Sequence, residues 1–153
     1  MNILYFLTGF LRKKGKGDTY IMDKKPFVTL EQLREIEKTY PTPFYIYDER
    51  GIRENAARLK QAFSWNKGYK EYFAVKATPN PFLLNILKDM GCGTDCSSMT
   101  ELMMSRACGF SGPDIMFSSN DTPPEEFAYA KKLGAIINLD DITHICLLYT
   151  SPS

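Results

Sequence analysis

Four short apolar runs recur along the chain, and each is followed by a stretch with helical periodicity. Short apolar runs bounded by turn residues predict buried strands. The four predicted strands are YFAVKA at 72–77, GTDCS at 93–97, IMFSS at 115–119 and AIINLD at 135–140. Helices are predicted after each strand, and the complete ones end near Gly91, Gly109 and Gly134, since glycine commonly terminates a helix.

The segment before these units carries signals of its own. Thr29 and Gln32 have the spacing of a capping box, so a short helix is predicted to begin there. FYIYD at 44–48 is predicted to be a strand. Asp48 can then cap a longer helix whose apolar face includes Ile52.

The alternation of apolar strands with short helices is typical of parallel strands joined by right-handed crossovers, so the predicted fold class is α/β. Two completions stay open: a small doubly wound sheet, or about the first four units of a (βα)8 barrel, which needs about 250 residues. The glycines at 91 and 93 are not a dinucleotide-binding motif, because they precede a strand and lack the third glycine.

The composition is that of an ordinary globular domain and argues against several function classes. Of the 153 residues, 44% are hydrophobic and 24% are charged, and the net charge is +1. This balance gives no support for nucleic-acid binding or membrane attachment. The apolar stretch within residues 1–20 is too short to span a membrane, and we interpret residues 1–26 as an N-terminal extension.

The cysteines and the histidine bound the site chemistry. The four cysteines form no CxxC pair, which favours reduced thiols in a cytoplasmic protein. The single histidine, His144, argues against a Ser-His-Asp triad or a histidine metal site, and we interpret it as a surface or helix-packing residue. No metal is predicted.

Polar side chains follow all four predicted strands. In both architectures the carboxyl ends of parallel strands meet at one edge, where functional sites form. The residues expected at that edge are Lys76, Thr78 and Asn80 from the end of the first strand onward, 95–98 from the second, 118–121 from the third, and Asn138 and Asp140 from the fourth.

Lys76 has the strongest chemical signal, because it interrupts an apolar run. A buried ammonium is costly unless it is paired or used chemically. Two interpretations stay open: the side chain extends to solvent or pairs with an acid, or it is a desolvated lysine that forms a Schiff base with a carbonyl group.

The other candidates also have structural alternatives. SMTE at 98–101 has the spacing of a capping box, so Glu101 either closes a helix, which the pattern slightly favours, or supports a Schiff base. Asp95 is equally consistent with a turn residue and with a partner of Lys76. Asn120 precedes DTPP, a context that favours a turn former over a ligand.

The segments FAVKATPNP, GCGTDCSSMTEL, IMFSSNDTP and INLDD, in this order and spacing, resemble the fold-type III pyridoxal-phosphate decarboxylases. This group holds the diaminopimelate, ornithine and arginine decarboxylases, and the chain looks most like the bacterial diaminopimelate enzymes. The resemblance runs from about Phe27 to Ile145, which corresponds to the first part of a family member.

The resemblance implies a role for each candidate residue. Lys76 matches the lysine that binds pyridoxal phosphate through a Schiff base, Asp95 and Glu101 look like acids of the cofactor pocket, and Asn120 falls where that pocket is lined. The implied activity is a carboxy-lyase reaction on an amino acid, with meso-diaminopimelate giving L-lysine and CO2 in lysine biosynthesis. Alternatives are another decarboxylase or a racemase of this fold type, or a non-catalytic pyridoxal-phosphate-binding protein.

The resemblance also implies the organisation of the chain. Residues 27–145 would form the N-terminal part of the pyridoxal-phosphate-binding barrel, the strand at 44–48 would belong to the family's β domain, and the full-length enzyme would be a cytoplasmic homodimer. Later family motifs, among them the ring-stacking histidine and the glycine-rich phosphate loop, have no counterpart here, so we expect the chain alone to be inactive. CLLYTSPS at 146–153 does not continue the preceding helix, and we interpret it as a non-native tail.

Overall fold

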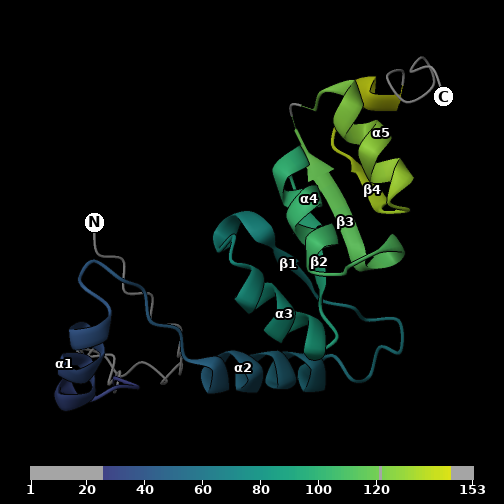
Figure 1. Cartoon of the computed structure of the whole chain (residues 1–153). Coiled ribbons are helices and arrows are strands. Elements are labelled where there is room, and N and C mark those ends of the chain that lie inside the picture. Colours follow the sequence, from purple (N-terminus) through teal and green to yellow (C-terminus); the bar gives the residue numbers. More distant parts are fainter. Residues whose placement is uncertain (1–25, 121, 146–153) are drawn as a thin grey trace, which may run out of the picture. The chain divides into compact units, whose positions relative to one another are not determined.

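The computed structural model describes residues 26–120 and 122–145, which divide into two compact units between Gly51 and Ile52 (Figure 1). The expected extension up to residue 25 and the expected tail at 146–153 lie outside the described residues. Within the described part, no helix combines the length and the apolar character needed to cross a membrane.

The first unit confirms the predicted capped helix but not the predicted strand. Helix α1 spans Leu30–Thr39, and Thr29 and Gln32 exchange the two hydrogen bonds of a capping box, 3.2 and 2.8 Å long. Residues 44–48 form no strand, because none of the described segments offers them a neighbouring ladder of hydrogen bonds. Helix α2, Glu49–Ala62, begins directly after Asp48, as predicted.

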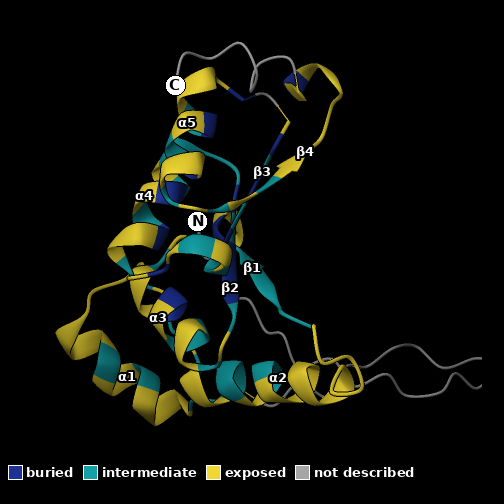
Figure 2. Cartoon of the chain, turned by 90° about the vertical axis from the view of Figure 1, so that its right-hand side faces the viewer, coloured by how far each residue is buried: buried dark blue, intermediate teal, exposed yellow. Residues whose placement is uncertain are grey.

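The second unit is a four-stranded parallel sheet with helices on one face. Its elements are β1 Tyr72–Ala74, α3 Pro81–Asp89, β2 Gly93–Cys96, α4 Met99–Ala107, β3 Ile115–Ser119, α5 Pro124–Lys132 and β4 Ile136–Leu139. The strands lie in the order β1-β2-β3-β4, each parallel to the next. Figure 2 shows α3, α4 and α5 together on one side of the strands.

This topology decides between the two predicted architectures, a doubly wound sheet and part of a (βα)8 barrel. A doubly wound sheet reverses its strand order at a switch point and carries helices on both faces. Here the order is sequential and the three helices share a face, as expected for consecutive units of a (βα)8 barrel. The helix boundaries agree with the sequence signals: Asn80 Oδ1 accepts a hydrogen bond from the N–H of Phe82, 3.0 Å, at the start of α3.

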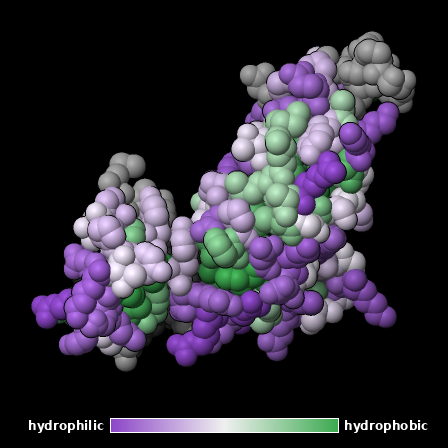
Figure 3. Space-filling view, in the orientation of Figure 1, coloured by the Kyte–Doolittle hydropathy of each residue, from purple (hydrophilic) through white to green (hydrophobic). Residues whose placement is uncertain are grey.

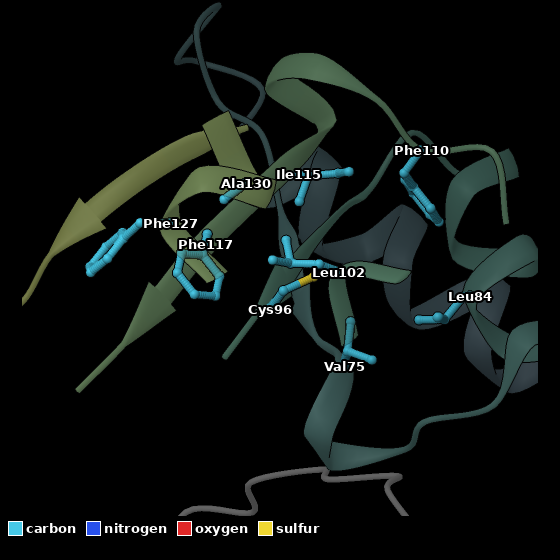
Figure 4. Close-up of a cluster of buried hydrophobic side chains, with 9 residues drawn as sticks. All are labelled: Val75, Leu84, Cys96, Leu102, Phe110, Ile115, Phe117, Phe127 and Ala130. Atoms are coloured by element: carbon cyan, nitrogen blue, oxygen red, sulfur yellow. The ribbon is translucent and has the colours of Figure 1, made fainter. Parts of the chain in front are cut away.

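The core lies between the sheet and these helices. Nine buried side chains form it, drawn in Figure 4: Val75, Leu84, Cys96, Leu102, Phe110, Ile115, Phe117, Phe127 and Ala130. Phe117 of β3 and Phe127 of α5 meet edge to face, with ring centroids 5.7 Å apart. Figure 3 shows apolar residues over the part that holds α4 and β3 and mostly hydrophilic residues along α2.

Candidate functional site

The register of the sheet sorts its side chains onto two faces. Directly paired residues on parallel strands point to the same side, and successive residues alternate. Thr94, Cys96, Ile115 and Phe117 are buried on the helix side. The opposite face carries one aligned row from the four strands: Ala74, Asp95, Met116 and Ile136. Ser118 and Asn138 pair in the next row, toward the carboxyl ends of the strands.

Lys76 does not lie in a buried strand, and that prediction is wrong. Strand β1 ends at Ala74, and Val75–Ala77 form a 3-10 turn, η1. Val75 is fully buried in the core, whereas Lys76 is exposed. The ammonium therefore reaches water in this chain, and the expected desolvation cost does not arise. The turn instead projects the amine from the carboxyl end of β1.

Asp95 is the buried polar group of the opposite face. Asp95 as a whole is half-buried. Among the described residues, no group donates a hydrogen bond to its buried Oδ1 atom. Burial raises the pKa of the Asp95 carboxyl; the nearby Lys76 charge opposes this shift, and the Glu101 charge adds to it. These three charged groups therefore share one electrostatic neighbourhood.

Glu101 closes the turn between β2 and α4. Its Oε2 atom accepts a hydrogen bond from the N–H of Ser97, 2.9 Å, and its Oε1 atom accepts from the hydroxyls of Ser97 and Ser98, 3.1 and 3.3 Å. The Ser98 hydroxyl in turn accepts from the N–H of Glu101, 3.4 Å. Ser98 therefore caps α4 as the pattern favoured, but the Glu101 carboxylate accepts from the N–H of Ser97 instead of completing a capping box with the N–H of Ser98.

The remaining candidates lie further apart. Asn120 is exposed at the end of β3, and no described contact joins it to Lys76, Asp95 or Glu101. Asn138 and Asp140 are also exposed. His144 is buried and meets the Phe127 ring at 5.5 Å, so it is a packing residue.

Glu126, a residue of α5, is a further polar residue near the candidate site that has no strong signal in the sequence. Its Oε1 atom accepts a hydrogen bond from the N–H of Met99, 2.9 Å, at the start of α4. No sequence spacing links positions 99 and 126, because α4, β3 and the start of α5 must pack together before they meet. Only the general preference for acids in the first turn of a helix marks the position.

The residues present fit an organic cofactor with a carbonyl group. An accessible primary amine can bond to a carbonyl carbon, and the unpaired Asp95 Oδ1 can accept a hydrogen bond from a bound group. Within residues 26–120 and 122–145, no three histidine, cysteine or acidic side chains gather as metal ligands would.

Comparisons with known proteins agree with this chemistry. The family model "Pyridoxal-dependent decarboxylase, pyridoxal binding domain" matches residues 49–150. Protein TabA of Pseudomonas amygdali pv. tabaci is 46% identical over 109 residues, 71% of this chain and 26% of that protein. Diaminopimelate decarboxylase of Methanothermobacter thermautotrophicus is 33% identical over 115 residues, 74% of this chain and 27% of the enzyme.

Solved structures share the fold of the chain. The crystal structure of diaminopimelate decarboxylase from Helicobacter pylori complexed with L-lysine matches with a TM-score of 0.69 and 30% identity, over 77% of this chain and 30% of that chain. This likeness confirms the predicted partial barrel. The chain spans about a quarter of the length of the curated relatives described above. Because the family model covers most of the chain, including the sheet and Lys76, the chain belongs to the pyridoxal-dependent decarboxylase family, whose cofactor is pyridoxal phosphate.

Proposed function

We propose that this chain is the cofactor-anchoring part of a pyridoxal-phosphate-dependent amino-acid decarboxylase, in which Lys76 binds the cofactor covalently. The observation that carries the proposal is the position of Lys76. Its exposed amine follows the carboxyl end of β1 and lies within the electrostatic influence of Asp95. In (βα)8 barrels the reacting groups come from this end of the strands.

Each proposed site residue has a separate role. Lys76 would hold the cofactor, because an unprotonated primary amine condenses with a carbonyl group and the carbonyl oxygen leaves as water. When bound, pyridoxal phosphate supplies an electron sink for the carbanion that remains after CO2 leaves the substrate. The Asp95 carboxyl, whose pKa the Lys76 charge lowers against the effect of burial, accepts a hydrogen bond from the bound group. Glu101 keeps the β2–α4 turn closed, and Asn120 lines the pocket from the end of β3.

We propose an amino acid as the substrate, with meso-diaminopimelate converted to L-lysine and CO2 as the reaction of the complete protein. The relatives named diaminopimelate decarboxylase, one of them solved with L-lysine, support this choice. A relative at 46% identity carries a different name, Protein TabA, so another decarboxylase or a racemase of this fold type is the alternative. A non-catalytic pyridoxal-phosphate-binding protein is a further one.

The anchor is tested by titrating the chain with pyridoxal phosphate and recording the visible absorption spectrum. We expect a new band that is lost in Lys76→Ala and retained in Lys132→Ala, which removes an exposed lysine from the last turn of α5. A spectrum unchanged by Lys76→Ala would refute the anchor.

The substrate is tested with a complete protein that contains this chain. We expect CO2 release from meso-diaminopimelate, with L-lysine as product, and little release from ornithine or arginine. The complete protein is expected to sediment as a homodimer, and the 153-residue chain alone is expected to release little CO2. Preference for another amino acid would reassign the substrate without affecting the role of Lys76.

A further inference from the structure

We propose that Glu126 is a positioning residue for the Lys76 site, because its carboxylate reaches from α5 and closes the start of α4. Closing α4 holds the β2–α4 turn, which follows Cys96, the residue after Asp95. This inference rests on the proposed function of Lys76 as the cofactor anchor. Glu126 does not take part in the chemistry.

The hydrogen bonds at the start of α4 show what Glu126 contributes. The first N–H groups of a helix have no acceptor within the helix and need one from outside. The N–H groups of Ser97 and Glu101 are accepted locally, by Glu101 and Ser98. The N–H of Met99 is accepted by Glu126 Oε1 at 2.9 Å. Among the described residues, Glu126 is therefore the acceptor at the start of α4 that comes from another helix.

The position of Glu126 is fixed by the packing of its own helix. Phe127, the next residue, is 3% exposed and packs edge-on against Phe117 of β3. Glu126 is half-buried, whereas its neighbour Glu125 is exposed. Both acids lie in the first turn of α5, where the helix dipole favours a negative charge on either. The dipole therefore favours Glu125 and Glu126 alike, whereas the contact with Met99 is made by Glu126.

The β2–α4 turn connects this contact to the Lys76 site. Ser97 and Glu101 close the turn with their hydrogen bonds, directly after the end of β2 at Cys96. Asp95 of β2 pairs with Ala74 of β1, two residues before Lys76, and the charges of Lys76 and Glu101 both act on Asp95. If the first turn of α4 opens, Glu101 separates from the N–H of Ser97, and the carboxylates change position relative to Lys76. Glu126 thus acts on Lys76 through the turn, without touching it.

Removal of the Glu126 carboxylate should leave α4 folded. Leu102 of α4 is fully buried, and Arg106 Nη1 meets the Tyr129 hydroxyl of α5 at 3.5 Å, away from Glu126. The effect of a Glu126 substitution is therefore expected at the start of α4 rather than over the whole unit.

The test compares three variants of the chain: Glu126→Ala, Glu126→Gln and the matched control Glu125→Ala. Each is incubated with limiting pyridoxal phosphate and reduced with borohydride, and mass spectrometry gives the ratio of label on Lys76 to label on Lys132. Hydrogen exchange of the Met99 amide is followed in parallel. The ratio is an internal measure that general loss of reagent does not change.

We expect Glu126→Ala to lower the labelling ratio about fivefold and to speed Met99 exchange, because one hydrogen bond to a charged acceptor is lost. Glu126→Gln keeps an acceptor oxygen and is expected to restore most of the ratio. Glu125→Ala is expected to match the unsubstituted chain, since Glu125 is exposed.

The outcomes separate this inference from the proposed function. An unsubstituted chain with no preference for Lys76 would overturn the proposed function. A normal preference that Glu126→Ala leaves unchanged, despite fast Met99 exchange, would overturn the role of Glu126. Should Glu126→Ala fail to fold, Glu126→Asp, whose carboxylate is one methylene shorter, is expected to lower the ratio with an unaltered circular dichroism spectrum. An unchanged ratio in that folded variant would also overturn the inference.

Discussion

The two faces of the sheet differ in what their side chains accomplish. On the helix side, Ile115 and Phe117 are fully buried and belong to one apolar cluster. On the opposite side, the row of Ala74, Asp95 and Met116 is half-buried, and it includes a carboxylate oxygen that accepts no hydrogen bond from any described residue. The first face stabilises the chain, and the second is available for ligand chemistry.

The difference shows that residues important for stability and residues important for the proposed site alternate along one strand. Consecutive residues of one strand, such as Met116 and Phe117, belong to different faces and should respond differently to substitution. The helix face contains the buried apolar cluster of these four units. The opposite face is the interior side of a barrel, whose remaining strands lie beyond the part of the relatives that this chain covers.

The largest expected effect is loss of core packing on the helix face. Phe117→Ala should lower the free energy of unfolding by about 3–5 kcal/mol, because it leaves a cavity beside Phe127. Met116→Ala, one residue away on the other face, should cost less than about 1 kcal/mol. Urea denaturation of both variants provides the comparison, and equal losses would remove the distinction between the faces.

A smaller effect is expected where the opposite face is crowded at the start of β2. A Cβ atom on Gly93 would lie 2.6 Å from the carbonyl oxygen of Asp114 and 2.6 Å from the Tyr72 ring. Tyr72 is held in place by the hydrogen bond from its hydroxyl to the carbonyl oxygen of Pro113, 2.6 Å. Gly93→Ala should therefore destabilise the chain by about 1–3 kcal/mol through overpacking.

Gly68→Ala is the matched control for Gly93→Ala, because its nearest atom would be 3.6 Å away. Thermal unfolding of the two variants measures the difference. If the two variants melt at the same temperature, the close approach of β1 and β2 at Gly93 is not rigid.

The smallest expected effect concerns the charge of Asp95. Burial raises the pKa of its carboxyl in the folded chain, so ionisation destabilises the fold as the pH rises above about 4, the value for an unperturbed aspartate. Asp95→Asn removes this cost and should make the chain slightly more stable at pH 7. The advantage should shrink as the pH falls toward about 4, where the unfolded-state carboxyl also becomes neutral.

Urea midpoints at several pH values measure this dependence, with Asp140→Asn, at an exposed carboxylate, as the control. A stabilisation of Asp95→Asn that does not vary with pH would contradict burial as its cause. Asp95→Asn also removes a carboxylate from the proposed site. Greater stability of this variant would therefore show that the Asp95 carboxylate lowers the stability of the fold.

The sequence predicted most of the fold because its local signals agreed with the final packing. The capping box at Thr29 and the β3 strand at Ile115–Ser119 were found where predicted. Residues 44–48 form no strand. Their pattern favours extended backbone, but it does not show whether another strand will pair with them.

The site was predictable in part, for a similar reason. Lys76 and Glu101 follow strands in the sequence and Asp95 lies near the end of β2, and the parallel topology brings them to one edge. The predicted strand at 72–77 was too long, because an apolar run does not reveal that β1 ends at Ala74 and that the chain continues as a 3-10 turn. The contact of Glu126 with Met99 depends on the docking of α5 against α4, which no local pattern encodes.

The central claim is that Lys76, rather than another exposed lysine, binds the cofactor. The direct measurement is peptide mapping by mass spectrometry after the chain has been mixed with substoichiometric pyridoxal phosphate and reduced with borohydride. We expect the label on the peptide that contains Lys76, with little on Lys131 or Lys132 of α5, which are equally exposed to the reagent but far from Asp95 in sequence. Label spread evenly over the exposed lysines would contradict the claim.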